Sequence, residues 1–331
     1  MPMNYTKTAL LLAALMAIFV IMGYAIAGQA GMVIAFVVAL AMNLFSFWNS
    51  DSVVLRMFRA EEVDAQTAPE YYALVAELSR RAELPMPRVY VLPSPQPNAF
   101  ATGRDPSHSA VAASTGLLDI LSREELAGVI AHELAHIKNR DTLTMTIAAT
   151  IGGAISMMAQ WLQFSMLFGG RDDNRSPFGF IGVIAAAIIA PFAAMLVQMA
   201  ISRSREYQAD RLGAMIVGNP LWLASALDKI GRRAKGIVYE EAEAVPAAAH
   251  LFIANPLTGR GFDNWFSTHP SMENRIQELE AMAQEWGVAG GASPRASFDE
   301  DGRPGTGPDS PGGPWSGAAP RRGGRRGGPW G

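Results

Sequence analysis

The stretch that decides the fold of this 331-residue chain begins at Ser122, ends at His136 and reads S-R-E-E-L-A-G-V-I-A-H-E-L-A-H. It predicts a helix, because Ser122 and Glu125 have the spacing of an N-terminal capping box and an apolar run follows them. His132 and His136 then share one face of the helix and can both reach one metal ion. Glu133 lies about 100° round the helix from His132, beside such an ion rather than on it. From there it can take a proton from water bound to a zinc ion.

A catalytic zinc site needs a third protein ligand and an open position. The chain has no cysteine, so this ligand must be a histidine or a carboxylate. Our candidate is Glu206, in the segment 204–210 that reads S-R-E-Y-Q-A-D. Asp210 falls one turn further along the same helix face, where it can accept the outer N–H of a ligand histidine. Spacing alone leaves open the alternative that both carboxylates pair with neighbouring arginines on a solvated face.

Hydrophobic residues make up 50% of the chain, which is too apolar for an ordinary soluble domain. No charged residue occurs at positions 8–50, 142–170 or 176–202. Since a spanning helix needs roughly 20 apolar residues, the first gap has room for two passes and each of the others for one. We expect about four membrane helices, at residues 8–27, 31–48, 142–168 and 178–201. The first two are expected to form an uncleaved hairpin rather than a signal peptide.

These observations predict a mainly α protein, with multi-pass membrane helices and a zincin-like α+β catalytic domain that contains a small β-sheet. Periodicity and turn signals place the helices of this domain at 69–81, 122–136, 202–217, 221–235 and 271–286, and its strands at 88–92, 98–102 and 109–114. The expected organisation is a membrane hairpin (1–50), a first catalytic part (51–141), two further spans (142–201), a second catalytic part (202–286) and a disordered tail rich in Gly, Pro and Arg (287–331).

Lysine and arginine residues near the ends of the apolar segments lie mostly on one side of a four-pass arrangement. Only Arg171 and Arg175 fall on the other side. The positive-inside rule therefore predicts that both termini and the catalytic parts are cytoplasmic, in a protein of the cell inner membrane. The net charge of −3 gives no indication of a nucleic acid partner.

Five motifs carry a resemblance to a known family. They are N-A-F-A-T-G at 98–103, H-E-L-A-H at 132–136, S-R-E-Y-Q-A-D at 204–210, H-P at 269–270 and N-R-I at 274–276. Together they resemble the M48 family of membrane zinc metallopeptidases, and in particular its bacterial heat-shock members, over roughly residues 5–285. The resemblance implies one zinc ion per chain, held by His132, His136 and Glu206, with Asp210 as the outer partner of a ligand.

The same resemblance implies roles for residues whose sequence context is otherwise plain. Asn98, Ala99 and Phe100 would form an edge strand beside the cleft, to which an extended substrate adds by main-chain hydrogen bonds. His269 would donate to the oxyanion that develops during the reaction. Arg275 would either support His269 or bind a carboxylate. Without the resemblance, the first three form only a short strand and His269 only precedes a helix. No motif surrounds His108 or His250, which we assign to loops or the surface.

The sequence thus predicts a zinc-dependent endopeptidase that cleaves misfolded or membrane proteins at the cytoplasmic face, in a stress-related quality-control role that comes from the resemblance. Its partners would be protein substrates and the lipid bilayer. The alternative is a non-catalytic zinc-binding membrane protein, such as a sensor or a transporter. The apolar segments carry no charge that a transporter would use, and a closed structural zinc site has no use for Glu133.

Overall fold

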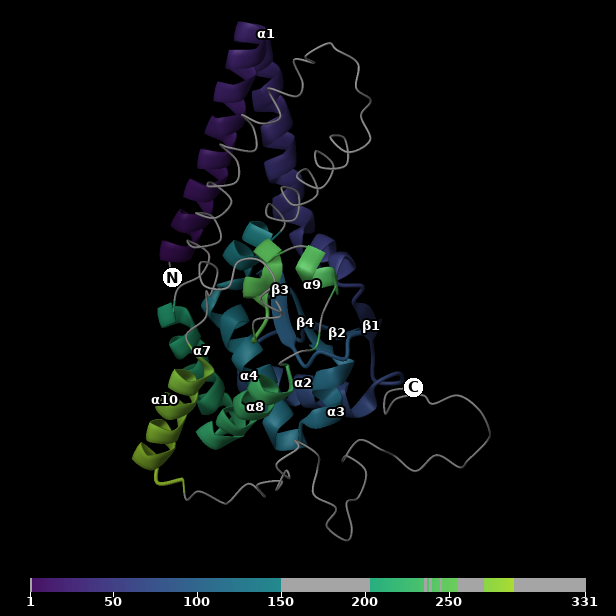
Figure 1. The fold of residues 1–331 in the computed structure, drawn as a ribbon, viewed down its shortest axis with the longest axis vertical. Coiled ribbons are helices and arrows are strands. Elements are labelled where there is room, and N and C mark those ends of the chain that lie inside the picture. The colour runs from purple at the N-terminus through teal and green to yellow at the C-terminus, as the bar shows by residue number, and fades with distance from the viewer. Residues whose placement is uncertain are drawn as a thin grey trace, which may run out of the picture.

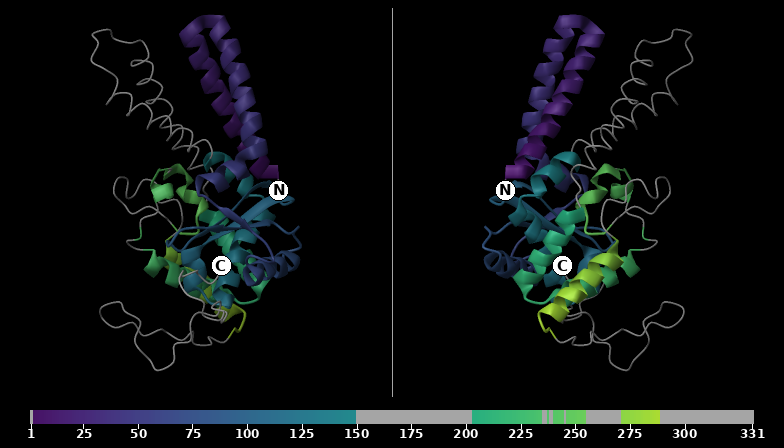
Figure 2. Two further views of the ribbon diagram at one scale, coloured as in Figure 1. Left: turned by 90° about the vertical axis from the view of Figure 1, so that its right-hand side faces the viewer. Right: turned by 90° about the vertical axis from the view of Figure 1, so that its left-hand side faces the viewer.

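A long helical hairpin stands away from an α+β body in the computed structural model, which describes residues 2–149, 203–234, 237, 240–244, 246–254 and 271–288 (Figures 1 and 2). The hairpin is α1 (Pro2–Met57), and it reverses at Ala27 and Gly28. Gly28 has φ 60° and ψ −143°, a conformation that glycine adopts without a steric penalty. The two arms pack closely, since a Cβ on Gly31 would lie 2.2 Å from the carbonyl oxygen of Gly23.

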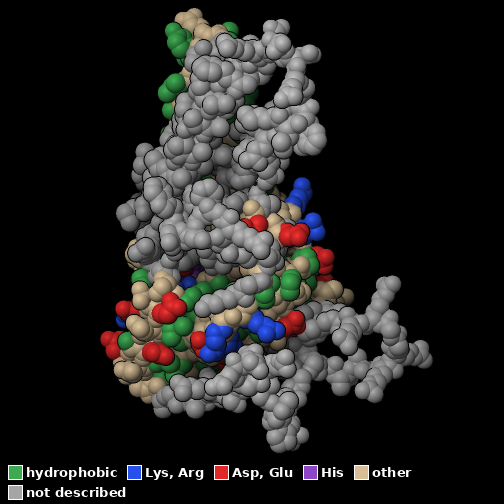
Figure 3. Space-filling model, in the orientation of Figure 1, with side chains coloured by type: hydrophobic (Ala, Val, Ile, Leu, Met, Phe, Trp, Pro, Cys, Tyr) green, Lys and Arg blue, Asp and Glu red, His purple; other side chains and the backbone are tan. Residues whose placement is uncertain are grey.

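The second arm of α1 has the properties of a membrane helix. Within the described part of the chain, Ala27–Asn49 is the one stretch long and apolar enough to cross a bilayer. Its mean hydropathy is 2.2, and little of it is buried inside the protein. Hydrophobic side chains cover the free end of the hairpin, whereas charged ones lie over the body (Figure 3). The expected spans at 142–168 and 178–201 lie outside the described residues, apart from 142–149. The expected total of four spans is therefore not established.

The body contains a four-stranded mixed sheet with the order β1-β2-β4-β3. Its strands are β1 (Glu61–Val63), β2 (Arg88–Leu92), β3 (Ala99–Asp105) and β4 (His108–Ser114). β2 and β4 are parallel and the other two pairs are antiparallel, so that β3 is an edge strand. The predicted strand at 88–92 is confirmed. The turn between β3 and β4 is shorter than predicted, because both strands extend toward Pro106. Their pairing is irregular between Gly103 and Asp105.

Both faces of the sheet are buried, because successive side chains along a strand point to opposite sides. Val89, Ala101 and Val111 lie in one hydrophobic cluster with α2 (Pro69–Arg81) and α4 (Arg123–Asn139). The alternate positions on β2, β3 and β4 lie in a second cluster, which joins the sheet to the end of α1 and to residues 242–252. The hairpin is thus attached directly to the sheet.

The structure also describes the helices α3 (Thr115–Ile120), α7 (Arg203–Val217), α8 (Pro220–Arg233), α9 (Glu240–Ala244), a 3-10 helix η1 (Pro246–Leu251) and α10 (Met272–Glu285), and a helical run at 142–149. The capping box of α4 is present, with reciprocal bonds between Ser122 and Glu125. Of the expected tail at 287–331, only residues 287 and 288 are described.

Two glycines set the distance between the helices that carry the site. A Cβ on Gly213 of α7 would lie 2.9 Å from the backbone nitrogen of His132 on α4. A Cβ on Gly128 of α4 would lie 2.7 Å from the backbone nitrogen of Leu223 on α8. Such contacts are shorter than real Cβ contacts, so α4 approaches both helices only because these positions lack a side chain. This close approach brings the acidic residues of α7 next to the histidines of α4.

Candidate metal centre

Helices α4 and α7 bring His132, His136 and Glu206 together, and one ligand atom of each lies within 4.8 Å of the others. The two Nε2 atoms are 3.2 Å apart. The carboxylate of Glu206 lies 3.5 Å from Nε2 of His136 and 3.9 Å from Nε2 of His132. Tetrahedral ligands with zinc–nitrogen distances of about 2.05 Å would lie roughly 3.3 Å from one another. The spacing of these three buried side chains therefore suits a small divalent cation.

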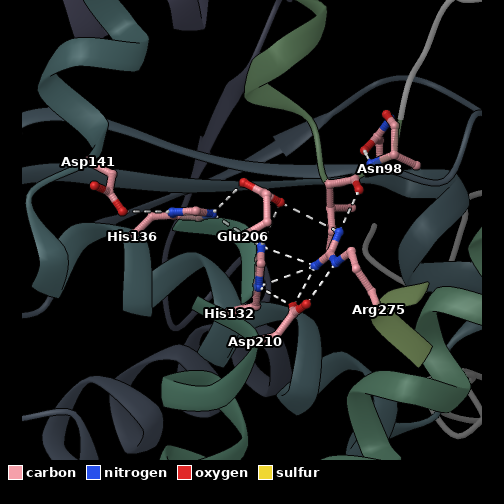
Figure 4. A network of polar contacts seen from close by, with 9 residues as sticks. Asn98, His132, His136, Asp141, Glu206, Asp210 and Arg275 are labelled. Carbon is pink, nitrogen blue, oxygen red and sulfur yellow. Dashed lines mark hydrogen bonds and ion pairs between the residues drawn. The ribbon is translucent and has the colours of Figure 1, made fainter. Parts of the chain in front are cut away.

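Each histidine turns its other ring nitrogen toward a carboxylate of its own (Figure 4). Nδ1 of His132 lies 2.9 Å from Oδ1 of Asp210, and Nδ1 of His136 lies 3.3 Å from Oδ2 of Asp141. An N–H donated from Nδ1 leaves the lone pair of Nε2 free to face the shared centre. Both rings are therefore held in the orientation that a metal ligand needs.

Arg275 of α10 contacts two carboxylates of the site and one backbone carbonyl from a fully buried position. Its Nε and Nη2 donate to the two oxygens of Asp210 at 2.9 and 2.6 Å. Its Nη1 lies 3.6 Å from Oε2 of Glu206 and donates to the carbonyl of Ile253 at 3.3 Å. Of the two expected roles for Arg275, the structure shows the contact with a carboxylate.

With both histidines neutral, as metal ligands must be, and the carboxylates ionised, the site would carry more negative than positive charge. Glu133, Asp141, Glu206 and Asp210 provide four buried carboxylates, against the two guanidinium groups of Arg205 and Arg275. With neutral histidines, two negative charges remain, which a divalent cation would neutralise. Isolated charges are unstable away from water, so this excess favours a bound cation.

The two histidines respond in opposite ways to this environment. Burial and the charge of Arg275 lower the pKa of His132 to about 4. Burial alone would also lower the pKa of His136, but the hydrogen bond to Asp141 and the charge of Glu206 outweigh it and raise the pKa to about 9. Without a metal, the pair therefore holds a proton at His136, and a bound cation would replace that proton.

Glu133 lies on the same helix as the two histidines but does not belong to the ligand group. It is 2% exposed, and the nearby backbone of Ala101 on β3 acts to lower the pKa of its carboxyl group. Burial, with a further contribution from Glu206, raises the pKa of Glu133 to about 7. A carboxylate with a pKa near neutrality can both accept and return a proton, which is what a general base requires.

Asn98, Ala99 and Phe100 lie at the start of the edge strand, as expected, but all three are buried to 1% exposure or less. The side chain of Asn98 accepts from the backbone N–H of Ala254 at 3.2 Å and donates to its carbonyl at 2.8 Å. The N–H of Ile253 donates to the carbonyl of Ala99 at 3.0 Å. A segment of the chain itself therefore occupies this part of the strand edge.

Sequence reasoning missed three buried polar residues, two of which lie beside the site. Asp141 contacts His136, and Arg205 lies 3.8 Å from Asp141. His250 was assigned to a loop or the surface, which is wrong: it is 1% exposed and its Nε2 lies 3.0 Å from the carbonyl oxygen of Met145. The exposed His108, paired with Asp105, fits its assignment. His269 lies outside the described residues.

Two histidines four residues apart, a glutamate from a second helix and a buried glutamate beside them are the arrangement of a metal-dependent hydrolase. The sequence profile of Peptidase family M48 matches residues 65–283, which is more than half of the chain and includes every described residue of the site. The chain belongs to peptidase family M48 and is a metallopeptidase.

A comparison with solved structures finds the crystal structure of Ste24p from S. mikatae. The two chains share 14% sequence identity with a TM-score of 0.46, and the match covers 84% of this chain and 66% of the other. This chain therefore spans slightly less than two thirds of the length of that relative.

Proposed function

We propose that this metallopeptidase is a zinc-dependent endopeptidase of a membrane, with one zinc ion held by His132, His136 and Glu206. The observation that carries the proposal is the convergence of these three ligand atoms beside a buried glutamate that is not one of them. Nitrogen and carboxylate ligands suit zinc, and three protein ligands leave a fourth position open for water or substrate.

When bound, zinc would lower the pKa of a water molecule and polarise the carbonyl of the peptide bond. Glu133 takes the proton of the attacking water and returns it to the leaving amine. Asp210 keeps His132 in the tautomer and orientation of a ligand, and Arg275 holds Asp210 in place. His269 donates to the oxyanion in this proposal, which rests on its position before Pro270 and on the family resemblance.

The substrates in this proposal are extended segments of misfolded or membrane proteins. β3 is an edge strand, and the backbone of its residue Ala101 lies close enough to Glu133 to act on the pKa of that carboxyl group. The carbonyl of Ala99 already accepts the N–H of Ile253. A substrate strand would therefore pair with β3 next to Ala101, beyond Ile253 and Ala254. Asn98, Ala99 and Phe100 then shape one end of the cleft.

The membrane location is supported by the apolar second arm of α1, and the cytoplasmic orientation by the distribution of lysine and arginine. The quality-control role follows the resemblance to bacterial heat-shock members of the family. A non-catalytic zinc protein is the alternative, and the buried position of Glu133 argues against it. A closed structural site would not keep a carboxylate of raised pKa beside its ligands.

The proposal is tested by comparing wild type with Glu133→Gln and Glu206→Ala after purification in detergent. Zinc content and cleavage of an unfolded protein such as casein are the two measurements. We expect Glu133→Gln to keep its zinc and lose roughly 10²–10⁴-fold in turnover, since only the proton carrier is removed. Glu206→Ala should lose zinc as well. Full zinc with wild-type cleavage in Glu133→Gln would disprove the mechanism. A wild type that binds zinc without cleaving any protein would favour the non-catalytic alternative.

A further inference from the structure

Asp141 stands at the point where α4 ends and the next helix begins. α4 stops at Asn139, and Arg140 adopts the left-handed conformation with φ 58° and ψ 35°. The backbone N–H of Asp141 then donates back to the carbonyl of His136 at 3.0 Å. This hydrogen bond, together with the left-handed Arg140, reverses the chain at the end of the helix. It thereby fixes the direction of Asp141.

The reversal carries the carboxylate of Asp141 back to the ring of His136, where Oδ2 lies 3.3 Å from Nδ1. Asp141 is 1% exposed, and its other oxygen lies 3.8 Å from Nη1 of Arg205. Asp141 therefore has the same relation to His136 that Asp210 has to His132 (Figure 4). The two carboxylates come from different elements, one from just beyond the end of α4 and one from α7.

We propose that Asp141 is a positioning residue that fixes the ring of His136 for metal binding, an inference that rests on the proposed zinc site. By accepting the N–H of Nδ1, Asp141 selects the tautomer whose Nε2 lone pair faces His132 and Glu206. A carboxylate in this position also makes the ring a stronger electron-pair donor. Loss of such outer partners typically weakens metal affinity by roughly 10–100-fold.

Asp141 is also anchored to the helix that follows it. Its carbonyl accepts from the N–H of Met145 at 3.2 Å. Met145 belongs to the helical run 142–149, in which every residue is buried. That run is fixed in turn to the edge strand, since the hydroxyl oxygens of Thr146 and Thr102 are 2.9 Å apart. The carboxylate is thus presented by a rigid junction. A shift of the helix that starts at residue 142 would move a group in contact with a metal ligand.

The test separates the contact with His136 from the role of Asp141 at the helix junction. Asp141→Ser keeps a residue that is favourable at a helix start but removes the carboxylate, and its hydroxyl is too short to reach His136. Asp141→Asn keeps the length and a side chain that is favourable at a helix start, but not the charge. Arg140→Gly is the matched control, because glycine adopts the left-handed conformation readily and leaves Asp141 in place.

Zinc affinity is measured for the full chain in detergent by competition with a chromophoric chelator. Two further measurements are the visible spectrum of the cobalt(II)-substituted protein and the melting temperature of the metal-free form. We expect Asp141→Ser to bind zinc roughly 10–100-fold more weakly with an altered cobalt spectrum, Asp141→Asn to be weakened less, and Arg140→Gly to match wild type. Wild-type affinity and spectrum in Asp141→Ser would overturn the inference, even if its metal-free form melts earlier. A wild-type chain that binds neither metal would instead contradict the zinc site itself.

Discussion

Arg275 and Asp210 form a double hydrogen bond inside the protein, with distances of 2.9 and 2.6 Å, although they are 65 residues apart in the chain. Arg275 is fully buried and Asp210 is 2% exposed. The pair joins α10 to α7 directly behind His132, so the last described helix is part of the support of the site. A buried ion pair adds little net stability, but the loss of one partner leaves the other as an uncompensated charge.

Replacing Arg275 with methionine is therefore expected to lower the free energy of unfolding by about 3–5 kcal/mol. Urea unfolding in detergent, followed by tryptophan fluorescence, measures the change. The control is Arg232→Met, because Arg232 forms a 2.6 Å ion pair with Asp228 on the surface of α8, where such pairs contribute about 0–1 kcal/mol. Equal effects of the two substitutions would show that the buried pair does not support the fold.

The metal-free protein should show a pH-dependent effect of Glu133. Because its pKa in the folded state is about 7, above the ordinary 4.5, Glu133 favours folding at low pH and this contribution is lost as the pH rises through 7. Metal-free Glu133→Gln should therefore melt at a higher temperature than metal-free wild type at pH 8, with the gap closing toward pH 5. A gap that stays constant between these pH values would contradict the raised pKa.

Phe58 at the base of the hairpin packs against Phe100 of β3 and Phe252, with ring centroids 5.7 and 4.8 Å away. Because all three rings are buried, Phe58→Ala should cost about 3–5 kcal/mol of unfolding free energy. The control is Phe45→Ala: Phe45 lies within α1, which ends one residue before Phe58, but it is 57% exposed, and its replacement should change thermal unfolding in detergent very little. A similar loss in both variants would mean that Phe58 does not join the hairpin to the sheet.

Asn98 holds the backbone of Ala254 by two hydrogen bonds, and its replacement by alanine leaves both backbone groups without that partner. We expect Asn98→Ala to speed the amide hydrogen exchange of Ile253 and Ala254, at a cost of about 1–3 kcal/mol. Gln96→Ala is the control, because the side chain of Gln96 donates instead to the carbonyl of Ile237. Unchanged exchange at both amides in Asn98→Ala would show that other contacts hold the segment.

Local patterns in the sequence were sufficient for the elements whose signals lie within a few residues. The helix at 69–81 and the strand at 88–92 have the predicted bounds, because helical spacing of apolar residues and simple alternation identify them. The capping box placed the start of α4, and the fixed spacing of His132 and His136 placed them on one face.

The residues that sequence reasoning missed depend on contacts between distant segments. β1 has three residues, none of them buried, and exists because it pairs with β2. Asp141 reaches His136 only because Arg140, a residue without the usual preference for the left-handed conformation, adopts it. The burial of His250 depends on its position next to Met145, 105 residues earlier in the chain. None of these relations leaves a periodic signal in the sequence.

The assembly of the site from segments far apart in the chain has a consequence for the newly synthesised protein. His132 and His136 emerge from the ribosome long before Glu206, and Arg275, which holds the partner of His132, emerges later still. A chain that has been translated only as far as α4 has two of the three proposed metal ligands and no support for either from α7. The proposed centre can therefore be completed only after nearly the whole catalytic region has been made.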